Sequence, residues 1–524
     1  MKQGDVSILP ASTDASVSFA TWLGFVAMCV GMFMAILDIQ VVASSLPAMA
    51  EALDIPEDRL SWIQTSYLIA EIIAIPLTGF LTRAISVRWL FAGSTLAFTL
   101  ASIGCALSDN FAELIFLRTV QGFCGGALIP TVFTTIFVLF EGKREALATT
   151  VAGSFAMIAP TLGPALGGWL TETYSWHAIF LINVVPGIIV TAIVAGIVRV
   201  GEPDWKLLRH IDYVTVILAA IFLASLELAL KEGPKRHWSG TFVWMLLAVC
   251  AVSCAFTIQQ CLARREPFVN LRRFRDLSFT CGCILSFVLG FGLFSATYMT
   301  PVFLGFVRGH TALEIGKIMI VAGAAQLAAA PFAAWLETRI DARKLALAGF
   351  AVFAAGLIVN GFEHPRWDFD EFLLPQILRG VAIMFCLLPS TRLALDGWPR
   401  DQLSDASALF NLMRNLGGAI GIALVDTVLE QRTEGHVKYL VAQLQAGHRA
   451  TAQFVGLPLR YFHERTIAPV DEFTKSIVKP LVEKAGVTMS FNEAWLMIGA
   501  LFVLALPALL LATRARPMRS QPQN

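Results

Sequence analysis

Residues 22–46 read WLGFVAMCVGMFMAILDIQVVASSL, an apolar run interrupted by one charged side chain, Asp38. About 20 apolar residues suffice for a helix to cross the hydrocarbon core of a bilayer. The run is too long for the apolar core of a cleaved signal peptide, so we expect it to be retained as a membrane-spanning helix. A carboxylate inside such a helix is costly and usually marks a functional site. Asp38 is therefore the first candidate residue.

The composition of the whole chain agrees with this stretch. Of the 524 residues, 56% are hydrophobic and only 15% are charged, and the net charge is +1. Soluble domains carry roughly a quarter charged residues, and nucleic-acid-binding proteins need a basic field. The composition excludes a soluble enzyme, a disordered protein and a nucleic-acid partner. It favours a polytopic membrane protein.

Apolar segments long enough to span a membrane recur along the chain. They begin near residues 20, 60, 89, 112, 145, 177, 212, 240, 278, 313, 343, 371, 403 and 491. We therefore predict an all-α fold with 14 transmembrane helices, whose two termini lie on the same side. Arginine and lysine are concentrated in the loops on that side, whereas the first loop on the other side is acidic, which predicts cytoplasmic termini.

An internal repeat divides the chain. Residues 82–93 read TRAISVRWLFAG and residues 338–349 read TRIDARKLALAG, at an offset of 256. Gly122 and Gly380, 258 positions apart, each precede an apolar run that ends in proline. Parallel repeats of this kind are a transporter architecture. The predicted parts are a cytoplasmic segment 1–19, a six-helix half 20–200, a two-helix insert 201–265, a six-helix half 266–514 that includes an external segment 430–490, and a cytoplasmic tail 515–524.

Four local patterns converge on one known family. They are LIFLRTVQGFCGGA at 114–127, APTLGPALGG at 159–168, WHAIFLINVVPG at 176–187 and FNLMRNLGG at 410–418. Together with the 14 predicted spans they resemble the major facilitator superfamily, and more narrowly its fourteen-span drug:proton antiporters of the EmrB/QacA type. The resemblance implies proton-coupled export of small amphipathic toxic compounds or drugs across a bacterial inner membrane by alternating access, without a cofactor. It also implies that segment 430–490, then periplasmic, either docks a periplasmic adaptor that leads to an outer-membrane channel or caps the pore.

Asp38 and Arg118 are predicted to lie at the same depth. Counting at 1.5 Å per residue puts them roughly 13 Å and roughly 12 Å below the external surface, so the two side chains can pair directly or through water. A neighbouring arginine favours the charged carboxylate and burial disfavours it, which suits a group that binds and releases protons. In the family, the acid and the fourth-span arginine are linked to proton coupling and substrate handling, and Gln121 and Gly122 belong to the same fourth-span motif. The alternative is a static ion pair that holds two helices together.

Three further charged residues lie inside predicted spans. Glu71 is a second candidate to carry the proton or to pair with a cationic drug, and the alternative is that it pairs with Arg414. Arg379 lies near the expected cavity between the halves. Because buried charges of both signs are present, cationic and weakly acidic substrates both stay open. Membrane lipid is the remaining partner, and no metal site is expected, because the nine cysteines lie in apolar runs and the eight histidines in predicted loops.

The stretch 159–168 predicts a close helix crossing. Gly163, Gly167 and Gly168 leave room for a neighbouring helix, and Pro164 favours a bend. The resemblance implies that this signature accompanies antiport rather than uptake, although Ala159 replaces the first glycine of the usual pattern.

The loop between the second and third spans departs from the family. Arg83 stands where the family carries an aspartate that latches the inner face. We therefore expect that latch to be missing and Arg83 to serve only the membrane topology. Two other functions stay open, an uptake or metabolite transporter of the same fold and an integral membrane enzyme or receptor. The loop positions of the histidines disfavour the enzyme.

Overall fold

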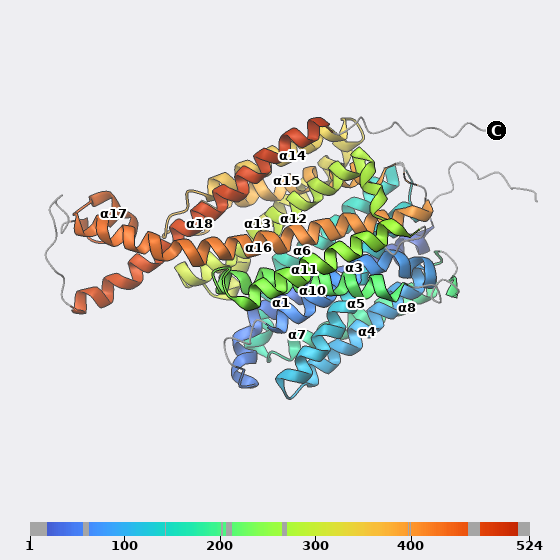
Figure 1. Ribbon diagram of the computed structural model, residues 1–524, viewed down its shortest axis with the longest axis horizontal. Helices are drawn as coiled ribbons and strands as arrows, with labels where there is room; N and C mark the ends of the chain where they lie inside the picture. The colour runs from blue at the N-terminus through green and yellow to red at the C-terminus, as the bar shows by residue number, and fades with distance from the viewer. Residues whose placement is uncertain are drawn as a thin grey trace, which may run out of the picture.

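The computed structural model describes residues 18–55, 62–141, 143–200, 203–205, 212–264, 270–396, 398, 400–459 and 472–511. All regular secondary structure in these ranges is helical, which confirms the predicted all-α fold. Within them, 13 helices are long and apolar enough to span a membrane, and the count becomes 14 if the bent helix α6 is one span. The long helices lie side by side in one bundle (Figure 1).

The helices begin close to the predicted span starts. The long ones are α1 (Phe19–Ala52), α3 (Trp62–Ile85), α4 (Val87–Leu107), α5 (Phe111–Leu139), α6 (Lys143–Thr173), α10 (Tyr213–Lys235), α11 (Thr241–Ala263), α12 (Leu277–Phe303), α13 (Ala312–Glu337), α14 (Ala342–Asn360), α15 (Phe369–Leu395), α16 (Arg400–Gln445) and α18 (Glu472–Leu511). Shorter helices are α7 (Ala178–Leu181) and α8 (Val184–Ile197), which together form one span, and α17 (Arg449–Val455). A 3-10 turn, η1 (Leu271–Arg275), precedes α12, and a π-helical turn, η2 (Leu304–Arg308), continues it.

Polar side chains at the helix starts fix several of these boundaries. Asn110 accepts a hydrogen bond of 2.9 Å from Glu113 N at the start of α5. Thr311 and Glu314 form a capping box at the start of α13, and Asp276 caps α12. Each cap satisfies amide groups that the first helical turn leaves without a partner.

The packing of the helices is duplicated along the chain. α1 packs on α6, α3 on α5, and α4 on α5 and α8, and in the same way α12 packs on α16, α13 on α15, and α14 on α15 and α18. A Cβ on Gly122 would collide with the carbonyl oxygen of Tyr67 in α3, and one on Gly380 with that of Ala322 in α13. The two glycines of the sequence repeat therefore make equivalent contacts. We call α1 to α8 the first set and α12 to α18 the second set, and the boundaries of the halves stay a prediction.

The helices α10 and α11 lie outside both sets. α10 packs on α3 of the first set and on α16 of the second, and α11 packs mainly on α10. Trp238 Nε1, between these two helices, donates a hydrogen bond of 2.8 Å to Thr427 Oγ1 of α16. Only 11% of the residues in the most apolar stretch of α11 are buried. The insert therefore bridges the two sets through α10 and presents α11 outward.

The helices α16 and α18 are much longer than a membrane is thick. With 46 and 40 residues, they extend over ~69 Å and ~60 Å at 1.5 Å per residue, against a hydrocarbon core of ~30 Å. Their far ends and α17 project from the bundle at the left of Figure 1, and we call this side the α17 end. Leu440, Val455 and Val482 pack together there in a small apolar core.

This extension corrects two sequence-based expectations. The helix that contains the last predicted span begins at Glu472, well before residue 491, because α18 continues through polar residues that a hydropathy criterion excludes. His436 lies inside α16, 3.1 Å from Glu493 Oε1 of α18, so the histidines are not all in loops. Residues 460–471 of the predicted external segment lie outside the described residues, as do most of the two predicted cytoplasmic tails.

An ion pair joins the two sets at the end of the bundle opposite α17. Arg83 Nη1 of α3 lies 2.6 Å from Asp405 Oδ2 of α16, and Arg273 Nη2 lies 3.5 Å from the same oxygen. A Cβ on Gly79, one turn before Arg83, would stand 2.7 Å from Asp405 Oδ1, so a glycine there permits the approach. The expectation that Arg83 serves only topology is therefore wrong. The two sets are linked at this position, with the arginine in the first set and the aspartate in the second.

Candidate functional site

Asp38 lies in a buried polar cluster between α1, α5 and the junction of α7 with α8. Arg118 Nη1 donates a hydrogen bond to Asp38 Oδ2. Gln121 Nε2 and Asn183 Nδ2 donate to Asp38 Oδ1 at 3.0 Å and 2.9 Å. The structure thus brings together the two residues to which the sequence assigns equal depth. Each carboxylate oxygen has a donor, as a buried charge requires.

Arg118 is fully buried and is held by more than its carboxylate partner. Its Nε donates to Ile63 O at 3.2 Å, and its Nη1 also donates to Gln121 Oε1 at 2.7 Å. The guanidinium carbon lies 4.4 Å from the ring centroid of Tyr67, a distance at which a cation is attracted by an aromatic face. A planar, five-donor group can make these contacts at once, and a lysine cannot.

Three members of this cluster are not among the site residues that the sequence predicts. Asn183 contacts Asp38 directly, and Ser102 Oγ accepts a hydrogen bond of 2.7 Å from Gln121 Nε2. Tyr67 stacks under Arg118 and donates a hydrogen bond of 3.1 Å to Ala35 O. Asn183 carries a signal that reasoning from sequence can use, because it is the one polar residue between 178 and 190.

The glycines of the fourth-span motif place the second span against this cluster. A Cβ on Gly125 would collide with the Tyr67 hydroxyl, and a Cβ on Gly126 would stand 2.5 Å from the backbone oxygen of Glu71. Together with Gly122, these residues let the backbones of α3 and α5 touch. This close contact sets Tyr67 beside Arg118.

Glu71 is buried one turn beyond Tyr67. Within the described part of the chain it makes no ion pair with any arginine, lysine or histidine, and the charges that act on it belong to Glu227 of α10 and to Arg118. Arg414 instead donates to Asn411 Oδ1 of its own helix. The structure does not bring Glu71 and Arg414 together, so the alternative in which they pair finds no support.

Arg379 belongs to a different cluster, in the second set. Its Nη2 donates to Gln376 Oε1 at 2.7 Å and lies 3.4 Å from Thr300 Oγ1 of α12. Its guanidinium carbon is 5.2 Å from the ring centroid of Trp495 in α18. The structure therefore separates Arg379 from Asp38, although both are buried.

The stretch 159–168 forms the predicted close crossing. A Cβ on Gly163 would collide with the side chain of Gln40, so α6 runs directly against α1, and Gly167 and Gly168 are buried in the same helix. The axis of α6 bends by 49° between the segments 147–160 and 165–173. The side chain of Pro164, which the sequence associates with a bend, lies outside the described residues.

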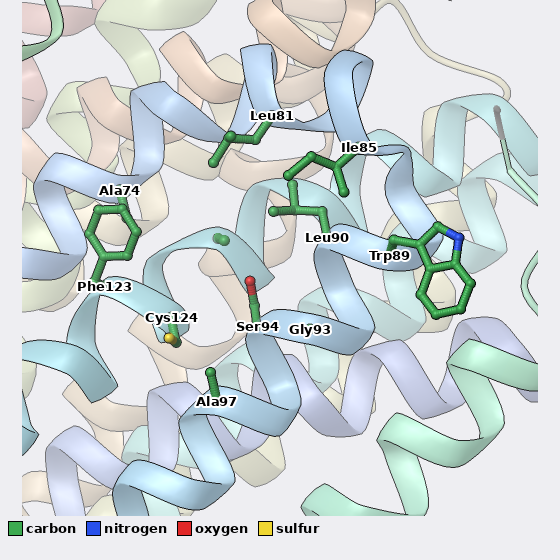
Figure 2. A pocket seen from close by; sticks show the side chains of 11 residues that line it. Ala74, Leu81, Ile85, Trp89, Leu90, Gly93, Ser94, Ala97, Phe123 and Cys124 are labelled. Atoms are coloured by element: carbon green, nitrogen blue, oxygen red, sulfur yellow. The ribbon is translucent and has the colours of Figure 1, made fainter. Parts of the chain in front are cut away.

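An apolar groove on the side of the bundle is separate from the Asp38 cluster. Figure 2 shows Ala74, Leu81, Trp89 and Phe123 lining it, between α3, α4 and α5. Trp89 and Phe123 are largely exposed, and the lining contains no charged side chain. This surface has the character of one that faces lipid.

Comparison with known proteins gives the chain its family. Residues 28–422 match the Major Facilitator Superfamily. The chain is 36% identical to the Colistin resistance protein EmrB of Acinetobacter baumannii, over 92% of this chain and 95% of that protein. It is 29% identical to the Multidrug export protein EmrB of Escherichia coli K12, over 92% of this chain and 93% of that protein.

A solved structure shares the fold. The crystal structure of the human organic anion transporter MFSD10 (TETRAN) is similar with a TM-score of 0.58 and 13% sequence identity, covering 93% of this chain and 99% of that one. The duplicated helix packing, the buried Asp38–Arg118 pair and the sequence matches point the same way. The protein is a member of the major facilitator superfamily and is related to the EmrB multidrug export proteins.

Proposed function

We propose that this protein exports small amphipathic compounds in exchange for protons, through a site that opens alternately to the two sides of the membrane. Two of its relatives are named as multidrug export and colistin resistance proteins. The observation that carries the proposal is the buried carboxylate of Asp38, held by Arg118 of α5 and by Asn183 at the α7–α8 junction. A charge at this depth is costly, and membrane transporters keep such charges for proton relays and substrate pathways.

The Asp38–Arg118 pair suits an exchange of proton for substrate for an electrostatic reason. Protonation removes the negative charge that faces Arg118 and leaves a buried cation without its partner. The first set must then rearrange until another acceptor, water or a substrate group reaches the guanidinium. Proton binding is thereby coupled to a change in packing between α1 and α5. Glu71, buried nearby without an ion pair among the described residues, is the second proton carrier to consider.

We infer that the α17 end faces the periplasm and that both termini lie in the cytoplasm, with the protein in the inner membrane of a bacterium. The helix ends and loops at the opposite end carry Arg83, Arg88, Arg272, Arg273, Arg275 and Arg339. Short loops rich in arginine and lysine stay on the cytoplasmic side.

We also infer that the projecting parts of α16, α17 and α18 dock a periplasmic adaptor that leads to an outer-membrane channel. Among the described residues of these projecting parts, the exposed large apolar side chains are Tyr439, Val441, Ile477 and Leu481. Exposed apolar residues grouped on a projecting element are typical of a partner surface.

Transport in everted membrane vesicles tests the proposed exchange. With an imposed pH gradient, the wild-type protein should accumulate an amphipathic dye, and D38N should lose the part of the uptake that an uncoupler abolishes. Asn cannot carry a proton, but it keeps the size of Asp. D109N is the matched control, because Asp109 is exposed between α4 and α5, and it should transport like the wild type.

Two outcomes contradict the proposal. Normal uncoupler-sensitive transport by D38N would remove Asp38 from the mechanism. Dye movement in the opposite direction, driven by the same gradient, would show an uptake transporter instead of an exporter.

A further inference from the structure

A second buried carboxylate lies at the α17 end of the second set. Glu363 is 1% exposed and sits in the loop between α14 and α15. The backbone of Glu363 is fixed by Asn492 of α18, whose Oδ1 accepts a hydrogen bond of 3.0 Å from Glu363 N and whose Nδ2 donates one of 2.9 Å to Glu363 O. The loop is therefore held in place without help from the glutamate side chain.

Glu363 belongs to a group of buried polar side chains whose atoms lack partners among the described residues. Within that part of the chain neither of its oxygens reaches full hydrogen-bond geometry with a donor, and Trp495 is the side chain that comes near enough to stabilise the carboxylate. Both amide atoms of Asn360, Gln376 Nε2 and Arg379 Nε likewise have no hydrogen-bond partner among the described residues. These side chains are all less than a tenth exposed, and buried polar atoms normally have partners. Donors and acceptors that lack partners can stabilise a carboxyl group in either of its two protonation states.

The arginine and glutamine of this cluster are the counterparts of Arg118 and Gln121 by internal symmetry, whereas its carboxylate comes from a different element. Gln376-x-x-Arg379 in α15 lies at the repeat offset of 258 from Arg118-x-x-Gln121 in α5, with arginine and glutamine exchanged. In both helices the arginine donates to the glutamine at 2.7 Å. The difference lies in the carboxylate, because Asp38 is in direct contact with its arginine and Glu363 is not.

The charges around Glu363 leave Arg379 as the group that acts on it. Burial raises the pKa of the Glu363 carboxyl well above its usual range, and the positive charge of Arg379 and a hydrogen-bonding interaction with Trp495 oppose this. On its own loop lie His364, whose pKa is lowered mainly by burial, and Arg366. On α18, Glu493 forms an ion pair of 2.8 Å with Arg432 of α16 and lies beside His436.

We propose that Glu363 and Arg379 form a second proton-binding site, loaded from the α17 side of the membrane. The inference rests on the proposed function for its role in transport. In the protonated form the Glu363 hydroxyl can donate to Asn360 Oδ1. In the ionised form an oxygen can accept from Trp495 Nε1 while the positive charge of Arg379 stabilises the carboxylate, and the proton leaves to water. One proton is bound and one released, and no other bond changes.

Infrared difference spectra of the purified full-length protein test this site without any transport. Between about pH 5 and about pH 9, the wild type should show a protonated-carboxyl band with a component that E363Q lacks. R379Q should move the midpoint of that component to higher pH by about one unit or more, because the nearby cation is gone. E434Q, which changes an exposed glutamate of α16, should leave the component unchanged.

A spectrum of E363Q identical to that of the wild type overturns the proposal. If E363Q does not fold, the R379Q variant provides the test. A midpoint of the carboxyl component that is the same in R379Q as in the wild type overturns the proposal as well. Vesicle transport then gives the role, and E363Q should take up fewer protons for each substrate exported. If export proves independent of protons while the band still titrates, the proposed function fails and the site stands.

Discussion

The carboxylate of Asp38 is satisfied by residues that are distant in the sequence. Arg118 and Asn183 lie 80 and 145 positions away from it. Each hydrogen bond to a charged group contributes about 1.5–3 kcal/mol to the stability of the folded protein. Removing one donor from a buried carboxylate therefore destabilises the fold. The hydrogen bonds to this one side chain therefore depend on the packing of α1, α5 and the α7–α8 junction against one another.

We expect N183L to destabilise the protein by about 1.5–3 kcal/mol, because it removes one of the three donors to Asp38 without opening a large cavity. The melting temperature in detergent should fall, and proton-driven transport should fall with it. T191V is the matched control, since the hydroxyl of Thr191 is buried in α8 and makes no hydrogen bond within the described residues. Equal melting temperatures for N183L and T191V would show that the Asn183 contact contributes nothing.

For single residues, the sequence predicts which side chains lie at the same depth in the membrane. Asp38 and Arg118 can be paired by counting residues from a membrane surface, since a helix converts residue number into distance. Asn183 and Glu363 cannot be found in that way. Their partners depend on which helices pack together, and a loop residue such as Glu363 has no depth to count.

At the scale of elements, the α3–α16 contact carries the clearest prediction. R83D and D405R should each weaken the link between the two sets, because each leaves two like charges facing one another. The double variant R83D/D405R should recover part of the loss, with a coupling free energy of about 0.5–3 kcal/mol. Recovery should be incomplete, because Arg273 would then face the new arginine.

Melting temperatures and export rates of the four proteins measure this coupling. The control is the exposed pair Glu434 and Lys438, 2.6 Å apart on α16 itself. Its reversal in E434K/K438E should leave export unchanged, because that pair lies within one helix and does not join the two sets. Additive effects of R83D and D405R would contradict the link.

The elements themselves follow from hydropathy, with two exceptions. The span starts are predicted within a few residues because the hydrocarbon core selects apolar runs. The early start of α18 and the length of α16 are missed, because outside the membrane a helix is stabilised by packing against a neighbour. The pairing of Arg83 with Asp405 is missed for a related reason, since 322 residues separate the two.

At the scale of the whole molecule, the bundle and the projecting helices are separable. Their packing meets near Gly486, where a Cβ would stand 2.5 Å from the Val437 side chain. Replacing residues 437–486 with a short Gly-Ser linker should leave dye transport in everted vesicles within about twofold of the wild type, because neither Asp38 nor Arg118 touches this part.

The same deletion should abolish resistance in intact cells if the projection docks an adaptor. Susceptibility of a strain that expresses the shortened protein is the measurement, with protein levels compared by blotting. Full resistance in cells would contradict the docking role, and loss of transport in vesicles would show that the projection is part of the pore.

The length of α16 has a mechanical consequence. One continuous helix runs from the Asp405 ion pair at one face of the membrane to the small core around Leu440 beyond the other. A rod of ~69 Å that pivots near its middle swings its two tips in opposite directions. If α16 pivots in this way, release of Arg83 from Asp405 at one tip would tilt the opposite tip, at the α17 end, at the same moment, and would move whatever rests on it.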